Sequence, residues 1–172
     1  MHELVPHPAF AALGVERLTA GVARDGSRLV AEYHLEGDLD RLYLPIDASS
    51  TRADGLWRTT CFEMFWQGKV GSPYAEFNFS PSRQWAAYRF RSPRTGQENL
   101  PVAGMAISKT LTNRGLRLRA EIDCQLPSPA VIALTAVIED AEGNHSYWAL
   151  HHFDDKPDFH DPRGRTIHME NT

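Results

Sequence analysis

Residues 60–90 constrain the fold of this chain more than any other part of its sequence. They contain three consecutive runs in which apolar side chains alternate with polar or charged ones. Successive side chains of a β-strand point to opposite faces, so each run predicts a strand with one face turned toward a core. Turn-forming residues such as Ser80-Pro81-Ser82 separate the runs. The stretch therefore predicts an antiparallel meander of three strands.

The same alternation recurs along most of the chain. Further strand-like runs lie at residues 29–35, 105–111, 116–123, 146–151 and 166–169. Residues 131–138 are almost continuously apolar, which is typical of a central strand buried on both faces. Residues 92–101 are polar and have no period, which predicts a long loop. Short strands, frequent turns and the lack of a long amphipathic helix predict an all-β fold, an antiparallel β-sandwich that forms a single domain over residues 1–172.

Composition narrows the functional classes. A chain of 172 residues with 42% hydrophobic and 23% charged residues is ordinary for a globular domain. A net charge of −4 argues against nucleic-acid binding, which needs clustered basic residues. The sequence has no run of eighteen apolar residues and no signal-peptide character at its start, so it favours a cytoplasmic protein without a membrane partner. Cys61 and Cys124 lack CxxC spacing and are expected to be reduced thiols.

Strand parity gathers polar groups on one face of the predicted meander. Glu63 in the first strand shares a face with Glu76 and Asn78 in the second. For the third strand, we assign Trp85 and Arg89 to this same face, which sets Arg89 near Glu76. The face would then hold two carboxylates, an amide and a guanidinium, with an indole at its edge.

Several interpretations of this face remain open. The simplest is a cross-strand salt bridge on a solvated surface. Aromatic rings beside carboxylates and amides also suit a sugar, because the ring stacks on C–H groups while the polar groups bind hydroxyls. Glu63 and Glu76 could alternatively serve a glycoside hydrolase, whose two carboxyls lie about 5 to 10 Å apart, although Arg89 would lower the pKa of the acid. In a further alternative, the aromatic face is the interface of a protein-interaction domain.

Several motifs together give a family resemblance. They are a Trp before a C-F-E-M-F strand, a Y-A-E-F-N-F-S-P strand, a W-A-A-Y strand, and a late A-L-T-A-V-I-E-D segment that leads through S-Y-W-A-L to P-D-F-H-D-P. Over residues 56–162 the chain resembles DOMON-like proteins of bacteria, which are relatives of carbohydrate-binding module family 9. The resemblance implies an immunoglobulin-like β-sandwich that binds a sugar or haem and has no catalytic role of its own.

The resemblance also points to individual residues. Trp57 matches the tryptophan before the acidic strand, Glu63 matches the family's strand glutamate, and Trp148 matches a late aromatic position that can form a second wall for a sugar. The chain departs from the pattern at Thr60, where an aspartate is usual, and this departure argues against a calcium role. Haem is disfavoured, because the parity above points Met64 into the core.

Residues 151–161 concentrate histidine and aspartate. His151, Asp158 and His160 have the side chains that zinc-type ions prefer. The segment contains a proline and lacks the H-E-x-x-H spacing of a helical metal site, so a solvated loop is the competing interpretation. We therefore treat these three residues as candidates for metal binding or ligand contact.

These observations predict a non-catalytic module that binds a carbohydrate or a similar small polar ligand and needs no cofactor. The oligomeric state is left open. The predicted ligand-binding residues are Trp57, Glu63, Glu76, Asn78, Trp85, Arg89 and Trp148.

Overall fold

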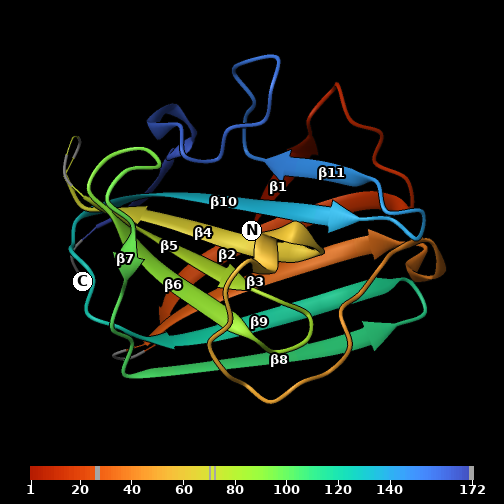
Figure 1. The fold of residues 1–172 in the computed structure, drawn as a ribbon, viewed down its shortest axis with the longest axis horizontal. Helices are drawn as coiled ribbons and strands as arrows, with labels where there is room; N and C mark the ends of the chain where they lie inside the picture. The colour runs from red at the N-terminus through yellow and green to blue at the C-terminus, as the bar shows by residue number, and fades with distance from the viewer. Residues whose placement is uncertain (26–27, 70, 72, 171–172) are drawn as a thin grey trace.

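The computed structural model describes residues 1–25, 28–69, 71 and 73–170, and the regular secondary structure of these residues is almost entirely β-strand (Figure 1). The strands are β1 (His2–Pro6), β2 (Val15–Asp25), β3 (Arg28–Gly37), β4 (Cys61–Gln67), β5 (Tyr74–Phe79), β6 (Trp85–Phe90), β7 (Glu98–Asn99), β8 (Gly104–Thr112), β9 (Gly115–Asp123), β10 (Ala130–Glu139), β11 (His145–Ala149) and β12 (Ile167–Met169). Short 3-10 turns lie at η1 (Leu39–Arg41), η2 (Leu56–Arg58) and η3 (Pro162–Gly164). Within these described ranges, no helix has the length and apolar character needed to cross a membrane.

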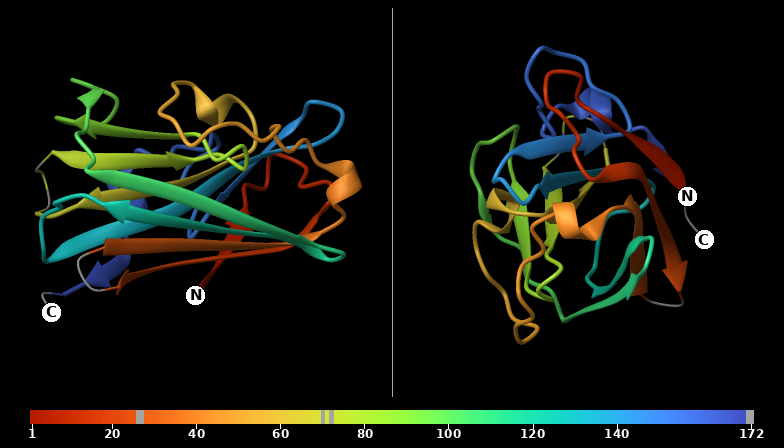
Figure 2. Two further views of the ribbon diagram at one scale, coloured as in Figure 1. Left: turned by 90° about the horizontal axis from the view of Figure 1, so that it is seen from below. Right: turned by 90° about the vertical axis from the view of Figure 1, so that its right-hand side faces the viewer.

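The strands form one antiparallel sheet that curls back on itself. Their order is β7-β6-β5-β4-β10-β11-β1-β2-β3-β9-β8, and β12 pairs with the start of β10. Strand β1 joins the two halves, since Leu4 pairs with β2 while Val5 pairs with β11. Figure 2 shows the half containing β4, β5 and β6 facing the half containing β2, β3 and β9. The predicted all-β, antiparallel class is confirmed.

The hydrophobic core lies between the two halves. Phe62, Met64 and Trp66 point from β4 into this core, where they meet side chains such as Tyr33 and Leu118 from the opposite half. Burying each large apolar side chain contributes about 1.5 to 3 kcal/mol. The Tyr33 hydroxyl crosses the core and donates a hydrogen bond of 2.6 Å to the backbone oxygen of Glu63. The core therefore fixes the inner face of β4 and leaves its other face available.

Most of the predicted strands are present. The runs at residues 29–35, 105–111 and 116–123 correspond to β3, β8 and β9, and the apolar run at residues 131–138 is β10, which is buried on both faces. The sequence did not predict β1, β2 and β7. Residues 92–101, predicted as a loop, are irregular except for the two-residue strand β7.

A long segment, residues 43–55, lies between β6, which neighbours the short end strand β7, and the end strand β8 (Figure 1). Its Thr51 and Ala53 form backbone hydrogen bonds with Trp85 of β6, and the Ser50 hydroxyl donates to the backbone oxygen of Met105 in β8. Arg52 donates to the backbone oxygens of β6 and of the chain after β7, each at 2.7 Å. The segment thus connects the two open edges of the curled sheet.

Candidate functional site

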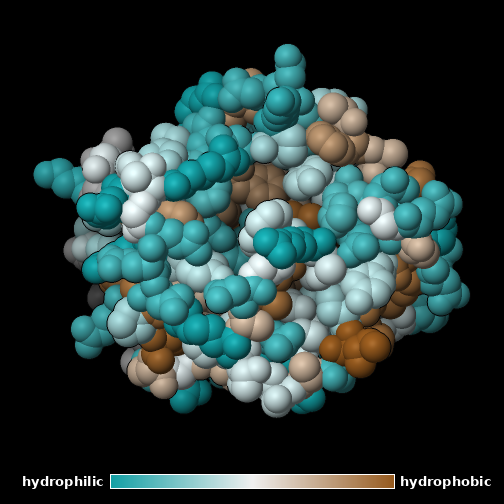
Figure 3. Space-filling model, in the orientation of Figure 1, coloured by the Kyte–Doolittle hydropathy of each residue, from teal (hydrophilic) through white to brown (hydrophobic). Residues whose placement is uncertain are grey.

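An open cavity of about 750 Å³ lies on the outer face of β4, β5 and β6, the face turned away from the core. The space-filling view shows the hollow near the middle of the molecule, between the segment that follows β11 and the turn η2 (Figure 3). Its floor includes Glu63, Phe65 and Glu76, and Phe159 and Tyr147 belong to its walls. A cavity of this size is within the range that binds small molecules in proteins.

Strand register brings the two glutamates of the floor together. Glu63 on β4 lies opposite Asn78 on β5, and Phe65 lies opposite Glu76. Glu63 and Glu76 are therefore diagonal neighbours on one face, a relation that typically separates residues on adjacent strands by about 7 to 8 Å. The structure thus places Glu63, Glu76 and Asn78 on a single face, as the alternation predicts.

Both carboxyl groups of the floor are deeply buried. Glu63 is 3% exposed and Glu76 is 6% exposed. Burial raises the pKa of both groups because it penalises the charged form, and the nearby Glu76 raises the pKa of Glu63 further. Each carboxyl also accepts one hydrogen bond, which lowers its pKa. The Thr135 hydroxyl donates to Glu63 Oε2 at 3.2 Å, and the Asn78 amide donates to Glu76 Oε1 at 2.6 Å. Desolvation outweighs both bonds.

Asn78 lies beneath the cavity and does not line it. Its side chain is 1% exposed, and its oxygen accepts a hydrogen bond from the Cys61 thiol at 3.5 Å. Burial raises the pKa of this thiol. Asn78 therefore positions Glu76 from below, and Cys61 is a buried structural thiol.

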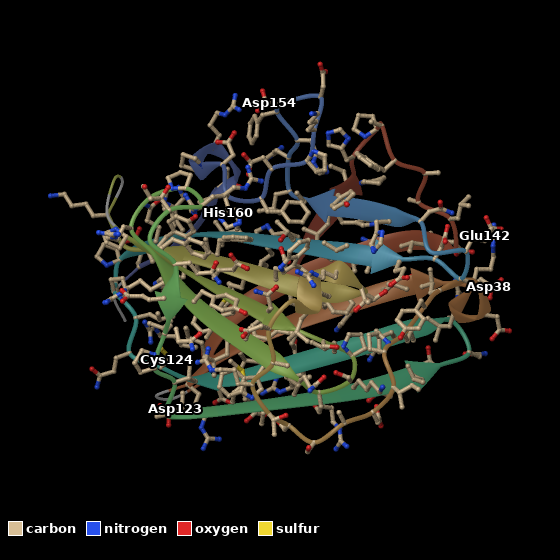
Figure 4. The ribbon with its side chains drawn as sticks, viewed as in Figure 1. Asp38, Asp123, Cys124, Glu142, Asp154 and His160 are labelled. Carbon is tan, nitrogen blue, oxygen red and sulfur yellow. The ribbon has the colours of Figure 1, made fainter. Side chains whose placement is uncertain are left out.

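His160 closes one end of the cavity. Figure 4 shows it where the segment after β11 descends onto the sheet. Its ring packs edge-on against Phe65 and Phe90, and its Nδ1 hydrogen-bonds the Tyr74 hydroxyl at 2.7 Å. Its Nε2 lies 3.6 Å from Glu76 Oε2. Arg165 holds the segment in place, with its guanidinium 4.2 Å from the centre of the Tyr74 ring.

We expect His160 to remain neutral at physiological pH. Burial, together with the nearby Arg94, lowers its pKa to about 4 from its ordinary value of 6.5. Between pH 4 and pH 6.5, His160 binds a proton in the unfolded chain but not in the folded protein. The free energy of unfolding therefore decreases as the pH falls from about 6.5 to about 4. An NMR titration should show a midpoint near pH 4 for the His160 ring. A midpoint at or above 6.5 would instead indicate an ion pair with Glu76.

Trp57 lies at the rim of the cavity with 52% of its surface exposed. Gly55 has a φ of +72°, a left-handed conformation that glycine adopts without strain, and this residue starts the turn η2 that carries the tryptophan over the floor. The Arg58 guanidinium lies 5.5 Å from the centre of the indole ring.

Thr60, which follows the turn η2, is buried. Its hydroxyl donates a hydrogen bond to the backbone oxygen of Tyr43 and accepts one from the backbone N–H of Glu139.

The predicted face of the third strand was wrong. Phe79 pairs with Trp85, so the indole shares the core face of β5 and packs against the Arg52 guanidinium at 4.8 Å. Arg89 also points away from the cavity, and its guanidinium forms an exposed ion pair with Glu98 at 2.6 Å. The residues of β6 on the cavity face are Ala86, Tyr88 and Phe90, because they oppose Asn78, Glu76 and Tyr74. Arg89 therefore does not neutralise Glu76.

Other predicted residues lie outside the cavity. Trp148 is 3% exposed, and its indole donates to the Ser146 hydroxyl at 3.0 Å within the core. Met64 points into the core, as predicted. His151 and Asp158 do not line the cavity, whereas His160 does. In the parts of the chain that the structure describes, no three histidine, cysteine or acidic side chains are grouped closely enough to hold a metal ion.

The sequence pattern did not identify several residues that shape the site. Tyr88 donates a hydrogen bond of 2.5 Å to Asp54, and burial followed by this acidic partner raises the pKa of its hydroxyl. Phe159 and Tyr147 complete the aromatic walls. Tyr88 points to the face opposite Arg89, so the alternation of the sequence by itself predicts that Tyr88 lies on the core face of the strand.

Comparisons with known proteins support the fold. No protein-family model matches the chain, and no curated protein matches its sequence. Among solved structures, the fold is similar to the crystal structure of a provisionally designated carbohydrate-binding protein from Bacteroides uniformis ATCC 8492. The two share 10% sequence identity with a TM-score of 0.62, over 95% of this chain and 84% of the other. At this identity the likeness shows a shared fold.

Proposed function

We propose that the protein is a non-catalytic module that binds a carbohydrate or a similar small polar ligand in the cavity over β4, β5 and β6. The observation that carries the proposal is the cavity itself, which combines buried hydrogen-bonding carboxyls with aromatic walls. Glu63 and Glu76 would accept hydrogen bonds from ligand hydroxyls, and Trp57 would cover one face of a ring at the rim. The Bacteroides structure supports this proposal through its fold and its own designation.

A screen of mono- and disaccharides by thermal shift, followed by isothermal titration calorimetry, tests the proposal. A ligand present at 100 times its Kd stabilises the folded state by about 2.7 kcal/mol. Replacing Trp57 with alanine should weaken binding by about 3- to 10-fold, because aromatic contacts of this type contribute about 0.5 to 1.5 kcal/mol. Phe153→Ala is the matched control, since Phe153 is similarly exposed at 44% and lies outside the cavity. Equal losses in both variants would contradict the proposed site.

Hydrolysis of a glycoside is a second candidate function, favoured by one observation. Glu63 and Glu76 both have raised pKa values, and Arg89, which would have lowered the pKa of the acid, lies on the opposite face. Both carboxyls nevertheless belong to the same floor, whereas a glycosidase places them on either side of the bond that is cleaved. Turnover of a nitrophenyl glycoside that Glu63→Gln abolishes without loss of binding would establish hydrolysis and refute the binding-module proposal.

We also propose that the protein is related to DOMON-like proteins and that its curled sheet is an immunoglobulin-like sandwich. A cytoplasmic location is part of the same proposal. A protein-interaction function through Trp85 has less support, because this side chain packs on Arg52 and against the core.

A further inference from the structure

In the described part of the chain, the two carboxyls at the cavity floor have no cationic partner at neutral pH. Among the described side chains, the one basic group within ion-pair distance of either carboxyl is His160, at 3.6 Å from Glu76 Oε2. His160 is neutral at pH 7, since its pKa is about 4. Glu76 Oε2 is also buried without a hydrogen-bond partner among these residues. Glu63 uses its Oε2 to accept from Thr135, and no hydrogen bond from another described residue reaches its Oε1.

The arginines around the cavity do not supply the missing charge. Arg94 forms an ion pair with Asp158, with the nearest N and O atoms 3.0 Å apart. Arg58 lies at the exposed rim, where its guanidinium packs on the Trp57 ring. Solvent and salt screen charges at the rim far more than charges at a buried floor, so these groups compensate the floor poorly. Within the described ranges, no arginine or lysine forms an ion pair with the floor carboxyls, so the floor is an acidic pocket.

The walls of the cavity also suit a positive charge. Phe65, Tyr88 and Phe90 lie on the same face as the two glutamates, and Phe159 comes from the segment above. The faces of aromatic rings carry partial negative charge and attract organic cations, most strongly where water is excluded. Carboxyls below and aromatic rings around them together form a site for an ammonium group attached to an otherwise neutral ring.

We propose that the cavity selects a sugar bearing a protonated amine, with the ammonium group seated between Glu63 and Glu76. This inference rests on the proposed carbohydrate-binding function and specifies its ligand class. The ammonium group would donate to Glu63 Oε1 and satisfy the unpartnered oxygen of Glu76, while the ring hydroxyls face the rim. Because ammonium binding favours the ionised carboxyls, it displaces any proton that they hold, and affinity should rise as the pH increases from the ordinary carboxyl pKa of 4.5 through the raised pKa values of Glu63 and Glu76.

The test is isothermal titration calorimetry at pH 7 with D-glucosamine, D-glucose, N-acetyl-D-glucosamine and choline. D-galactosamine and D-galactose are measured alongside, because the floor does not fix the stereochemistry of the ring. We expect an amino sugar to bind about 10-fold or more tightly than its neutral counterpart, the scale of a charge-assisted hydrogen bond. The N-acetyl derivative, which has no charge, should lose this advantage. Glu63→Gln and Glu76→Gln should each bring the ratio close to one.

Glu121→Gln is the matched control, since this carboxylate pairs with Arg28 and Arg119, away from the cavity, and the same substitution there should leave the ratio unchanged. The possible outcomes separate the two proposals. Equal affinities for amino and neutral sugars would overturn this inference and leave the carbohydrate function standing. Binding of choline without any sugar would support the cation site and overturn the carbohydrate function. The absence of binding by every ligand would overturn both.

Discussion

Replacing Glu63 with glutamine is expected to raise the melting temperature at pH 8 by about 4 to 8 °C and to change it little at pH 4. Because burial raises the pKa of Glu63, the folded protein keeps a proton that the unfolded chain releases above its ordinary pKa of 4.5. Folded stability therefore falls as the pH rises from 4.5 through the raised pKa. An uncompensated buried charge costs on the order of 2 kcal/mol or more, and 1 kcal/mol corresponds to about 2 to 4 °C in a chain of this size.

Thermal unfolding across pH 4 to 9 measures this effect, with Glu98→Gln as the control. Glu98 also lines the cavity, but its carboxylate is exposed and paired with Arg89, so its substitution should shift the melting temperature by less than about 2 °C at any pH. A Glu63→Gln variant that is less stable than the wild type at pH 8 would show that the carboxylate is compensated, and the acidic floor would lose its basis.

Replacing Trp66 with alanine is expected to lower the free energy of unfolding by about 3 to 5 kcal/mol. Trp66 is 1% exposed in the core, and its indole donates to the backbone oxygen of Pro127 at 2.9 Å. The substitution removes this hydrogen bond and leaves a cavity between the halves of the sheet. Trp57→Ala should cost less than about 1 kcal/mol, because half of that side chain is already exposed.

Urea denaturation of the two variants measures the difference. The two tryptophans are close in sequence, because Trp57 precedes β4 and Trp66 lies within it. The structure nevertheless places Trp57 at the cavity rim and Trp66 in the core. Similar losses in both variants would mean that the core and cavity faces of β4 are not separated as described.

The sequence predicted the cavity floor better than its walls. In β4 and β5 all the polar groups Glu63, Glu76 and Asn78 fall on one parity, opposite to the apolar set of Phe62, Met64 and Trp66 that needs a core. This contrast fixes the direction of Glu63, although Phe65 shares its face. In β6 both faces carry aromatic side chains, because Trp85 and Tyr88 are three positions apart and therefore point to opposite faces of the strand. Periodicity alone could not set the phase of this strand, because Ala86, Tyr88 and Phe90 form its more apolar set and favour the core face, whereas in the structure they lie on the cavity face.

The remaining walls depend on contacts between distant parts of the chain. His160 reaches the floor because Arg165 and Tyr74 hold its segment on the sheet, more than eighty residues after Tyr74 in the sequence. Strands β1 and β2 escaped prediction because β1 is short and ends at Pro6, and because Gly21 and its small neighbours weaken the apolar signal of β2. Local patterns carry no information about contacts of these kinds.

The most direct measurement uses the indole N–H signals of the four tryptophans in a two-dimensional NMR titration with a sugar that binds. Trp57 lies at the cavity rim, whereas Trp66 and Trp148 are in the core and Trp85 packs on the other face of the sheet. We predict that the Trp57 signal shifts with ligand concentration while the other three remain in place. A titration that moves Trp85 and leaves Trp57 unchanged would place the ligand on the opposite face and contradict the binding site.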